Sequence, residues 1–273
     1  MEEVWWLVAL AAAMAATGLV SGLLAGLLGV GGGIVIVPLL FLVFPFFDIP
    51  EAIQMKLAVG TSLATIIPTS IVSARKHRAS GAMDEALLRS IWLPMMLGVI
   101  LGTLLAVHVR GEGLTAVFAI VALLVALNMG FTGVDFRLAD KVPQGPPRAA
   151  LGAGIGSVSA MMGIGGGTLG VPILSMLGHP IRAAVATSSV FGLIISVPAT
   201  AGFIWGGWNV PDLPPFSLGY VSLVGFALIV PSSIIATPWG VKLAHTIKPL
   251  WLKRAFAVFL AVTSLRMFYS LFA

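Results

Sequence analysis

The sequence predicts an all-α, multi-pass membrane protein made of two repeats with inverted topology. Three observations support this fold class. Of the 273 residues, 59% are hydrophobic and 9% are charged, and the mean hydropathy is +1.08, whereas soluble domains carry about 25% charged residues. Apolar stretches long enough to cross a bilayer recur along the chain, and a glycine-rich motif occurs once in each half.

Seven apolar stretches reach the roughly 20 residues that one helical crossing needs. They lie at residues 4–28, 52–74, 89–109, 114–134, 182–205, 217–242 and 250–272. Three further stretches, at 33–46, 149–162 and 167–178, are too short for a comfortable crossing. The polar segment VDFRLADKVPQGPPR (134–148) contains three prolines, so we interpret it as a linker between two groups of helices.

The two groups repeat one another. GLLGVGGGIVIVPLL (26–40) returns as AMMGIGGGTLGVPIL (160–174), with four glycines and a proline aligned. KLAVGTS (56–62) then matches RAAVATS (182–188), so a cation and a Thr-Ser pair recur at equal spacing. We therefore divide the chain into an N-terminal transmembrane repeat (1–134), a linker (135–147) and a C-terminal transmembrane repeat (148–273). In each repeat, a glycine-broken helix pair, re-entrant or fully spanning, precedes three transmembrane helices.

Positive charge alternates between equivalent loops of the two repeats. ARKHRASGAMDEALLR holds four Lys and Arg residues, and its counterpart WGGWNVPDLPPF holds none. In the next pair HVRGEG holds one, and VKLAHTIKPLWLKR holds four. Because positive loops stay in the cytoplasm, equivalent loops lie on opposite faces. The linker is then cytoplasmic, and both termini are periplasmic provided that each glycine-broken pair returns to its starting side. Such an inverted repeat is typical of secondary transporters.

The glycine clusters predict an anion site. A helix that begins there leaves its first N–H groups without intrahelical partners, and the helix dipole adds partial positive charge. Glycines let an anion approach the backbone without a Cβ in the way. The predicted contacts are Gly31, Gly32, Gly33 and Ile34 in the first repeat, and Gly165, Gly166, Gly167 and Thr168 in the second. We expect Pro38 and Pro172 to break these helices and to free carbonyl groups.

Side chains of the next helix complete the predicted site. Lys56 and Arg182 lie near the starts of their helices, where they would attract anions at the two mouths of the pathway or simply anchor the interface. The hydroxyls of Thr61, Ser62, Thr187 and Ser188 lie deeper. They would donate to substrate oxygens or make hydrogen bonds between helices. The glycines also have an alternative function, since small residues let membrane helices pack closely.

Several functions are disfavoured by what the sequence lacks. There is no Cys, and no Asp or Glu lies in the middle of a predicted span, so cation transport is disfavoured. No catalytic or zinc motif is present, and we expect neither an enzyme nor a bound metal or cofactor. The four His residues fall at predicted helix ends, where surface positions are expected. The expected partners are a small anion and the lipid bilayer, not nucleic acid.

The doubled Gly-x-Gly-Gly-Gly motif, each copy followed by a proline and then by an Ala-Val-x-Thr-Ser helix, resembles the sulfite exporter TauE/SafE family of bacterial inner-membrane permeases. The resemblance implies export of sulfite or an organosulfonate such as sulfoacetate. The inverted repeat predicts a midplane site exposed alternately to either side by rocking of the halves. A passive anion channel and an uptake permease for thiosulfate, sulfate or phosphate remain alternatives. So does a membrane scaffold that transports nothing.

Overall fold

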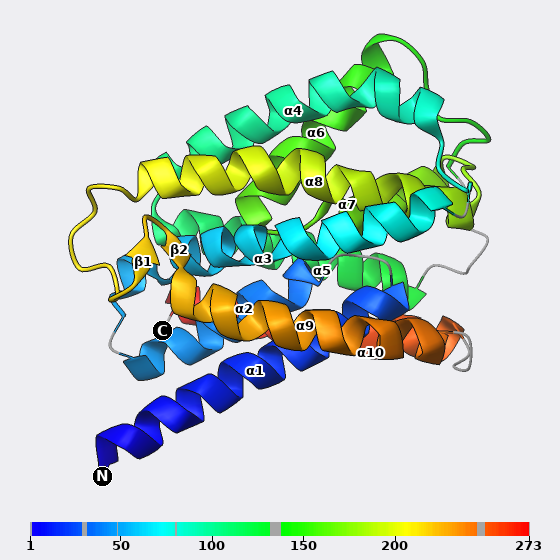
Figure 1. The fold of residues 1–273 in the computed structure, drawn as a ribbon. Coiled ribbons are helices and arrows are strands. Elements are labelled where there is room, and N and C mark those ends of the chain that lie inside the picture. Colours follow the sequence, from blue (N-terminus) through cyan, green and yellow to red (C-terminus); the bar gives the residue numbers. More distant parts are fainter. Residues whose placement is uncertain are drawn as a thin grey trace.

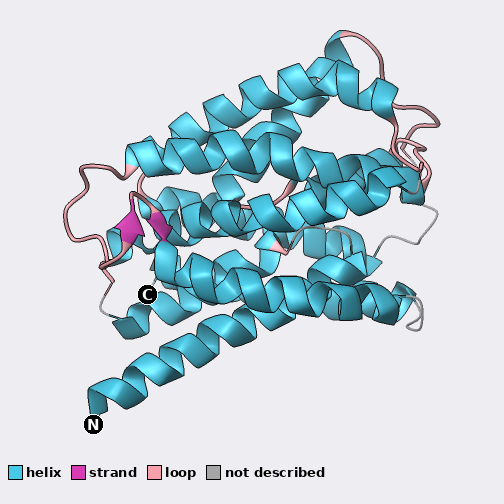
Figure 2. Cartoon of the chain, in the orientation of Figure 1, coloured by secondary structure: helices cyan, strands magenta, loops and turns pink. Residues whose placement is uncertain are grey.

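The protein is a bundle of helices in the computed structural model, which describes residues 2–28, 32–47, 49–79, 81–131, 138–244 and 249–272 (Figures 1 and 2). The helices are α1 (Glu2–Leu28), α2 (Gly33–Val43), α3 (Glu51–Ala79), α4 (Glu85–His108), α5 (Gly111–Phe131), α6 (Pro146–Met162), α7 (Gly166–Met176), α8 (Ile181–Gly206), α9 (Leu223–Ala244) and α10 (Pro249–Phe272). A 3-10 turn, η1 (Phe44–Phe47), follows α2. Five of these helices, namely α3, α4, α5, α8 and α9, contain segments long and apolar enough to cross a membrane.

The all-helical prediction is confirmed except at one element. The stretch expected to be helical from residue 217 instead begins with β1 (Ser217–Leu218) and β2 (Val221–Ser222), which pair antiparallel before α9 starts. Two prolines precede β1 in the sequence Leu-Pro-Pro-Phe. Asp212 and Phe216 have φ angles of 64° and 59°, a left-handed conformation that no helix contains. The chain therefore turns back on itself here before it enters the bundle.

The glycine-broken pairs return to the end of the bundle from which they start. We call the end that carries β1 and β2 the β end, and the end that carries residues 138–145 the linker end. Figure 1 shows α1 leaving the β end and α2 running back toward it. The α6–α7 pair starts and finishes at the linker end, since the N–H groups of Leu138 and Ala139 donate to the carbonyl of Met176 at the end of α7. Each pair thus begins and ends at the same end of the bundle.

Each of the main helix–helix contacts joins one of the first five helices to one of the last five. α1 packs along α9, and α6, its equivalent in the sequence repeat, packs along α4, the equivalent of α9. α3 packs against α8 and α5 against α10, so each of these pairs joins two equivalent helices. α3 and α8 are the most buried of the five candidate spans, and they form the centre of the bundle (Figure 1).

The surface is apolar and the interior holds many hydroxyl groups, the reverse of a soluble protein. Leu93, Leu97, Leu101 and Leu104 project outward from α4. In contrast, the central helices α3 and α8 bury most of their Ser and Thr side chains. This distribution suits a bundle surrounded by lipid, because exposed leucines cost nothing in hydrocarbon while polar groups must find partners inside.

Glycines spaced four residues apart bring helices into backbone contact. A Cβ added at Gly152 of α6 would lie 2.5 Å from Cγ1 of Ile91 in α4, and one at Gly156 would meet the carbonyl oxygen of Met95. A Cβ added at Gly22 of α1 would similarly meet backbone atoms of α9. These pairs are small-xxx-small interfaces, which pack membrane helices when apolar burial gives little driving force.

We predict that Gly156→Ala lowers the stability of the detergent-solubilised protein by about 1–3 kcal/mol, because the new methyl group overpacks the α4–α6 interface. Gly154→Ala in the same helix is the matched control, since a Cβ there meets nothing within 4 Å. Thermal unfolding of the two variants should show a lower midpoint for Gly156→Ala only. Equal midpoints would contradict the role assigned to close packing.

Candidate anion site at the helix breaks

The two helix breaks, far apart in sequence, touch in the middle of the bundle. A Cβ added at Gly33, the first residue of α2, would lie 2.7 Å from the carbonyl oxygen of Gly163 and 3.1 Å from Cα of Ile164. Gly163 ends α6 with a φ of 67°, in the left-handed region that glycine adopts without strain. The predicted halves of the site are therefore adjacent, and glycine is needed where their backbones meet.

Ser62 of α3 joins the two breaks. Its Oγ donates a hydrogen bond of 2.7 Å to the carbonyl of Gly163 and lies 3.4 Å from the carbonyl of Gly33. The side chain is fully buried. A single hydroxyl thus lies within reach of carbonyl groups of both breaks, and Ser62 is one of the residues that the sequence predicts at the site.

The N-termini of α2 and α7 have no side-chain cap. Gly32 precedes α2 with a φ of 73°, and Gly165 precedes α7 in an extended conformation. Neither glycine offers a side chain, and the first N–H groups of each helix have no intrahelical acceptor. Gly31, also predicted as a contact, lies outside the described residues.

The predicted helix-breaking prolines lie inside helices that continue past them. Pro38 is within α2, which ends at Val43, and Pro172 is within α7, which ends at Met176. Each proline removes one N–H, and this leaves the carbonyls of Ile34 and Thr168 without their usual intrahelical donor. The interruption itself lies at the glycines, whereas Pro38 is the sixth residue of α2 and Pro172 the seventh of α7, and both helices continue past them.

Buried hydroxyls without partners in the described chain lie on α6, α7 and α8, three helices that pack against one another. The hydroxyl oxygens of Thr168, Ser188 and Ser159 are buried and have no hydrogen-bond partner in the described part of the chain. The Oγ of Ser188 would lie 2.7 Å from a Cβ added at Gly170, which places it against α7. Unpaired buried donors are costly, so such a group of hydroxyls is a candidate for ligand contact.

The glycines at the start of α7 also have a packing role. A Cβ at Gly166 would meet Cβ of Phe191 in α8, and one at Gly170 would lie 2.9 Å from the ring of that residue. The backbone of Gly166 therefore packs directly against α8, and a larger residue would not fit there. Gly167 and Ile34 are buried near the same breaks.

Thr61 and Thr187 make matching contacts with the starts of helices from the other half of the chain. Thr61 contacts the start of α9, and Thr187 contacts the start of α4. The Oγ1 of Thr61 accepts a 2.9 Å hydrogen bond from the N–H of Ser222, and the Oγ1 of Thr187 accepts one of 3.0 Å from the N–H of Asp84. Ser222 and Asp84 each accept from an N–H three residues on, at Gly225 and Leu87. Each threonine thus positions a helix start, leaving only its hydroxyl hydrogen for another acceptor.

Lys56 and Arg182 occupy different environments. The Nζ of Lys56 donates to the carbonyl of Val107 at 2.8 Å and lies 5.5 Å from the ring centroid of Tyr220. None of the ion pairs among the described residues involves Lys56. Arg182, at the linker end, is exposed and has no interaction with another described residue. The cation at the β end is held by the protein, whereas the one at the linker end is free.

The turn between β1 and β2 covers the β end of the central helices. Tyr220 is only 4% exposed, its N–H donates to the carbonyl of Phe203, and its ring packs edge-on against that of Phe203. A Cβ added at Gly60 would meet the carbonyl oxygen of Tyr220. Burial raises the pKa of the Tyr220 phenol, so the ring beside Lys56 stays neutral. Nothing in the sequence marked Tyr220, because its role depends on a turn that reads as part of a helix.

His179 and Asp84 were also missed by sequence reasoning, which assigned them to the surface or to loops. The side chain of His179 is 15% exposed, and its Nε2 lies 3.7 Å from Oδ2 of Asp84. These residues lie at the linker end, in the turn between α7 and α8 and at the start of α4. No group of three or more His, Asp and Glu side chains among the described residues is placed to hold a metal ion.

Comparison with known proteins gives consistent matches along almost the whole chain. Residues 14–267 match the model of the family described as sulfite exporter TauE/SafE. A probable membrane transporter protein of Haemophilus influenzae is 34% identical over 240 residues, which cover 88% of this chain and 91% of the relative. One of Methanocaldococcus jannaschii is 30% identical over 249 residues, 88% of each chain. No solved structure matches.

We predict that Ser62→Ala destabilises the protein by about 1–3 kcal/mol, because it leaves the buried Gly163 carbonyl without its donor. Ser188→Ala removes a buried hydroxyl that has no described partner, so its unfolding midpoint should stay near that of the unmodified protein. Both are measured by thermal unfolding in detergent. If Ser188→Ala were the more destabilising of the two, the hydrogen-bond assignment at the breaks would be wrong.

Proposed function

The chain belongs to the sulfite exporter TauE/SafE family, which makes it a multi-pass membrane transporter, and we propose that it exports a small sulfur-containing oxyanion. Sulfite or an organosulfonate such as sulfoacetate is the proposed substrate. The observation that supports this most directly is that two helices begin without a side-chain cap at breaks that touch, and that Thr168 and Ser188 carry buried hydroxyls without a partner in the described chain. Such N-termini attract anions through free N–H groups and the helix dipole.

The proposed site is asymmetric. The hydroxyl of Ser62 is already used by the carbonyl of Gly163, while that of the equivalent Ser188 has no partner in the described chain. The residue after the glycines is Ile34 in the first half and Thr168 in the second. We therefore assign most of the polar contacts with the anion to Thr168, Ser188 and the first N–H groups of α7. The start of α2 contributes its backbone.

An inverted repeat is part of the proposal. The α1–α9 and α6–α4 pairs exchange equivalent helices, and the contacts of Thr61 and Thr187 correspond residue by residue. One re-entrant pair opens to the β end and the other to the linker end (Figure 1). These features support transport by rocking of two related halves around a fixed midplane site, as in other inverted-repeat transporters.

We assign this structure to a state closed at the β end. Tyr220 is buried against Phe203, and its ring lies over the ammonium of Lys56. Thr61 holds Ser222 at the start of α9. Opening of this end would move the β1–β2 turn away from α3 and α8, and it would release the Lys56 ammonium to attract an anion. A permanently open channel would not need such a cover.

The linker end is proposed to face the cytoplasm. Arg75, Arg78, Arg89, Arg148 and Arg182 all lie at helix ends on this side. By the positive-inside rule, the β end and both chain termini are then periplasmic, in the inner membrane of a bacterial cell.

Anion binding can be tested by thermal unfolding in detergent with sulfite, sulfate, thiosulfate, taurine, sulfoacetate or phosphate. A ligand that binds only the folded state at 100 times its Kd stabilises it by about 2.7 kcal/mol, so we expect a raised midpoint with sulfite or sulfoacetate. Thr168→Val and Ser188→Ala should each weaken the apparent Kd by about tenfold, the effect of losing one hydrogen bond to a charged group.

Ser196→Ala is the matched control for this binding experiment. Ser196 also carries a buried, unpartnered hydroxyl on α8, but it lies two turns beyond Ser188, so the apparent Kd should be unchanged. A flat response to all six compounds would contradict the anion site and favour a scaffold whose glycines only pack helices.

The orientation can be tested with single cysteines, because the chain contains none of its own. In intact cells, a membrane-impermeant maleimide should label Trp208→Cys, which is exposed at the β end, and should not label Gln144→Cys at the linker end. Ser222→Cys is near-isosteric and buried beneath the β1–β2 turn, so it should react slowly. In a Tyr220→Ala background its labelling should rise at least threefold.

The reverse labelling pattern of Trp208→Cys and Gln144→Cys would overturn the assigned orientation. Fast labelling of Ser222→Cys with Tyr220 present would overturn the closed β end.

A further inference from the structure

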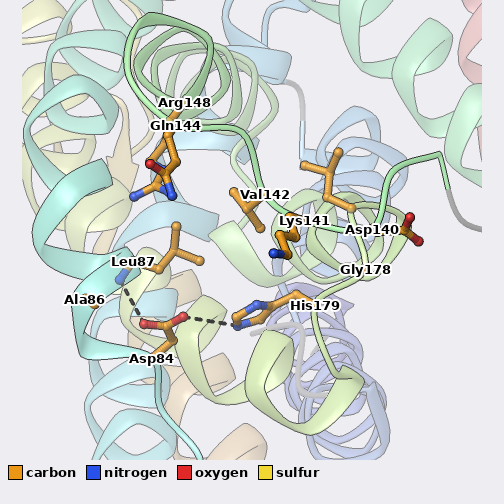
Figure 3. A pocket seen from close by; sticks show the side chains of 11 residues that line it. Asp84, Ala86, Leu87, Asp140, Lys141, Val142, Gln144, Arg148, Gly178 and His179 are labelled. Carbon is orange, nitrogen blue, oxygen red and sulfur yellow. Dashed lines mark hydrogen bonds and ion pairs between the residues drawn. The ribbon is translucent and has the colours of Figure 1, made fainter.

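A pocket of about 380 Å³ lies at the linker end, at the junction of elements from both halves of the chain (Figure 3). Its walls are the start of α4, the linker, the start of α6 and the turn between α7 and α8. The volume is that of about a dozen water molecules, at roughly 30 Å³ each. It is therefore large enough for a small anion that keeps part of its hydration. The polar side chains that line it are Asp84, Asp140, Lys141, Gln144, Arg148 and His179.

Arg148 is held in a fixed position in the wall of this pocket. Its Nε donates to the carbonyl of Pro143 at 2.8 Å, and its Nη1 donates to Oγ of Ser90 at 2.8 Å. A guanidinium has five N–H donors, so these two bonds fix the group and leave donors for a ligand. A planar, pre-oriented guanidinium suits an oxyanion because it can engage two oxygens at once.

Lys141 is the second cation of the pocket. Its side chain is exposed and has no hydrogen bond or ion pair with another described residue. Figure 3 shows its ammonium directed toward the centre of the pocket, between Leu87 and His179. The positive charge of this group is therefore available to a ligand.

Neither acidic side chain forms an ion pair with these two cations. Oδ1 of Asp84 accepts from the N–H of Leu87 at 2.9 Å, and Oδ2 lies 3.7 Å from Nε2 of His179. One oxygen of the Asp84 carboxylate thus caps the start of α4, and the other lies beside the imidazole without a hydrogen bond to it. Asp140 turns its carboxylate away from the pocket centre (Figure 3). The charged donors that remain free within the pocket are the Lys141 ammonium and the unused N–H groups of Arg148.

We propose that this pocket is a loading site, in which Lys141 and Arg148 bind the transported oxyanion or sulfonate before it reaches the helix breaks. The proposal rests on the proposed function. Leu177 and Gly178, which line the pocket, directly follow α7, whose first turn carries Thr168 at the breaks. The 11 residues of α7 span about 16 Å. Asp84 at the rim donates its N–H to Thr187, the neighbour of Ser188.

The linker fixes this pocket to α7. The N–H groups of Leu138 and Ala139 donate to the carbonyl of Met176 at 2.7 and 3.2 Å. Gly178 has a φ of 76°, and a Cβ there would lie 2.5 Å from the carbonyl oxygen of Asp140, so only glycine permits this approach. Movement of α7 during transport would therefore move Lys141 as well, which changes the pocket as the site opens or closes.

The loading site predicts a one-sided kinetic effect of Lys141→Gln. Sulfite uptake is measured, under nitrogen, in inside-out vesicles, where the linker end faces the medium, and in right-side-out vesicles. The KM of the variant should rise about threefold to tenfold in inside-out vesicles only, as expected for loss of one partly exposed charge contact, with kcat unchanged. Arg110→Gln, which removes an exposed charge near the β end, is the control and should not raise that KM.

An unchanged KM in inside-out vesicles, or an equal rise in both kinds of vesicle, would overturn the loading site while leaving the proposed function intact. Absence of transport by the unmodified protein would instead count against the proposed function. The pocket would then still be tested by a measurement that needs no transport.

That second measurement is protection of Gln144→Cys from N-ethylmaleimide by sulfate, an inert dianion. Sulfate should slow labelling at least threefold, and adding Lys141→Gln should remove the effect. Labelling of Trp208→Cys should not respond. Nanodiscs of phosphatidylcholine and of phosphatidylglycerol distinguish a lipid headgroup from a free anion, because loss of protection only in phosphatidylglycerol would assign the pocket to lipid. Lack of protection in both would overturn anion binding there.

Discussion

Two helix breaks inside an apolar bundle impose the constraint on which the rest of this structure depends. In hydrocarbon, each backbone N–H or C=O without a partner costs several kcal/mol, so a break is tolerated only where protein, water or ligand serves the freed groups. Here the breaks are placed against one another, with Gly33 on Gly163, and Ser62 serves carbonyls of both. The returning helix pairs and the central helices α3 and α8 enclose this contact.

Equivalent residues of the two repeats do different work in this conformation. Ser62 is committed to the breaks while Ser188 has no described partner, and Lys56 is covered by Tyr220 while Arg182 is exposed. A symmetric sequence therefore gives an asymmetric set of available donors. A ligand shifts an equilibrium between two conformations only if it binds them with different affinity. Different free donors in the two repeats are one source of such a difference.

The glycines illustrate how one residue type meets two requirements. Gly166 and Gly170 lie against Phe191, and Gly156 lies against Met95, so close helix packing accounts for them without any ligand. Gly32 and Gly163 adopt left-handed conformations where α2 begins and α6 ends. Glycine is needed at these two positions by the backbone conformation of the break itself. Packing and ligand approach both call for the absence of a Cβ, and the sequence pattern alone does not separate them.

The sequence by itself determined the membrane class, the extent of nearly every helix and the position of both breaks, because apolar length and glycine clusters act locally along the chain. The sequence repeat also indicated which residues of the two halves are equivalent. Only the tertiary structure decided that each broken pair returns to the end of the bundle where it starts, that Thr61 and Thr187 hold helix starts, and that the Tyr220 ring lies beside the Lys56 ammonium. The pocket of Lys141, Arg148 and His179 likewise depends on the linker folding onto the end of α7. These features come from contacts between segments distant in sequence, and no local propensity or periodicity encodes them.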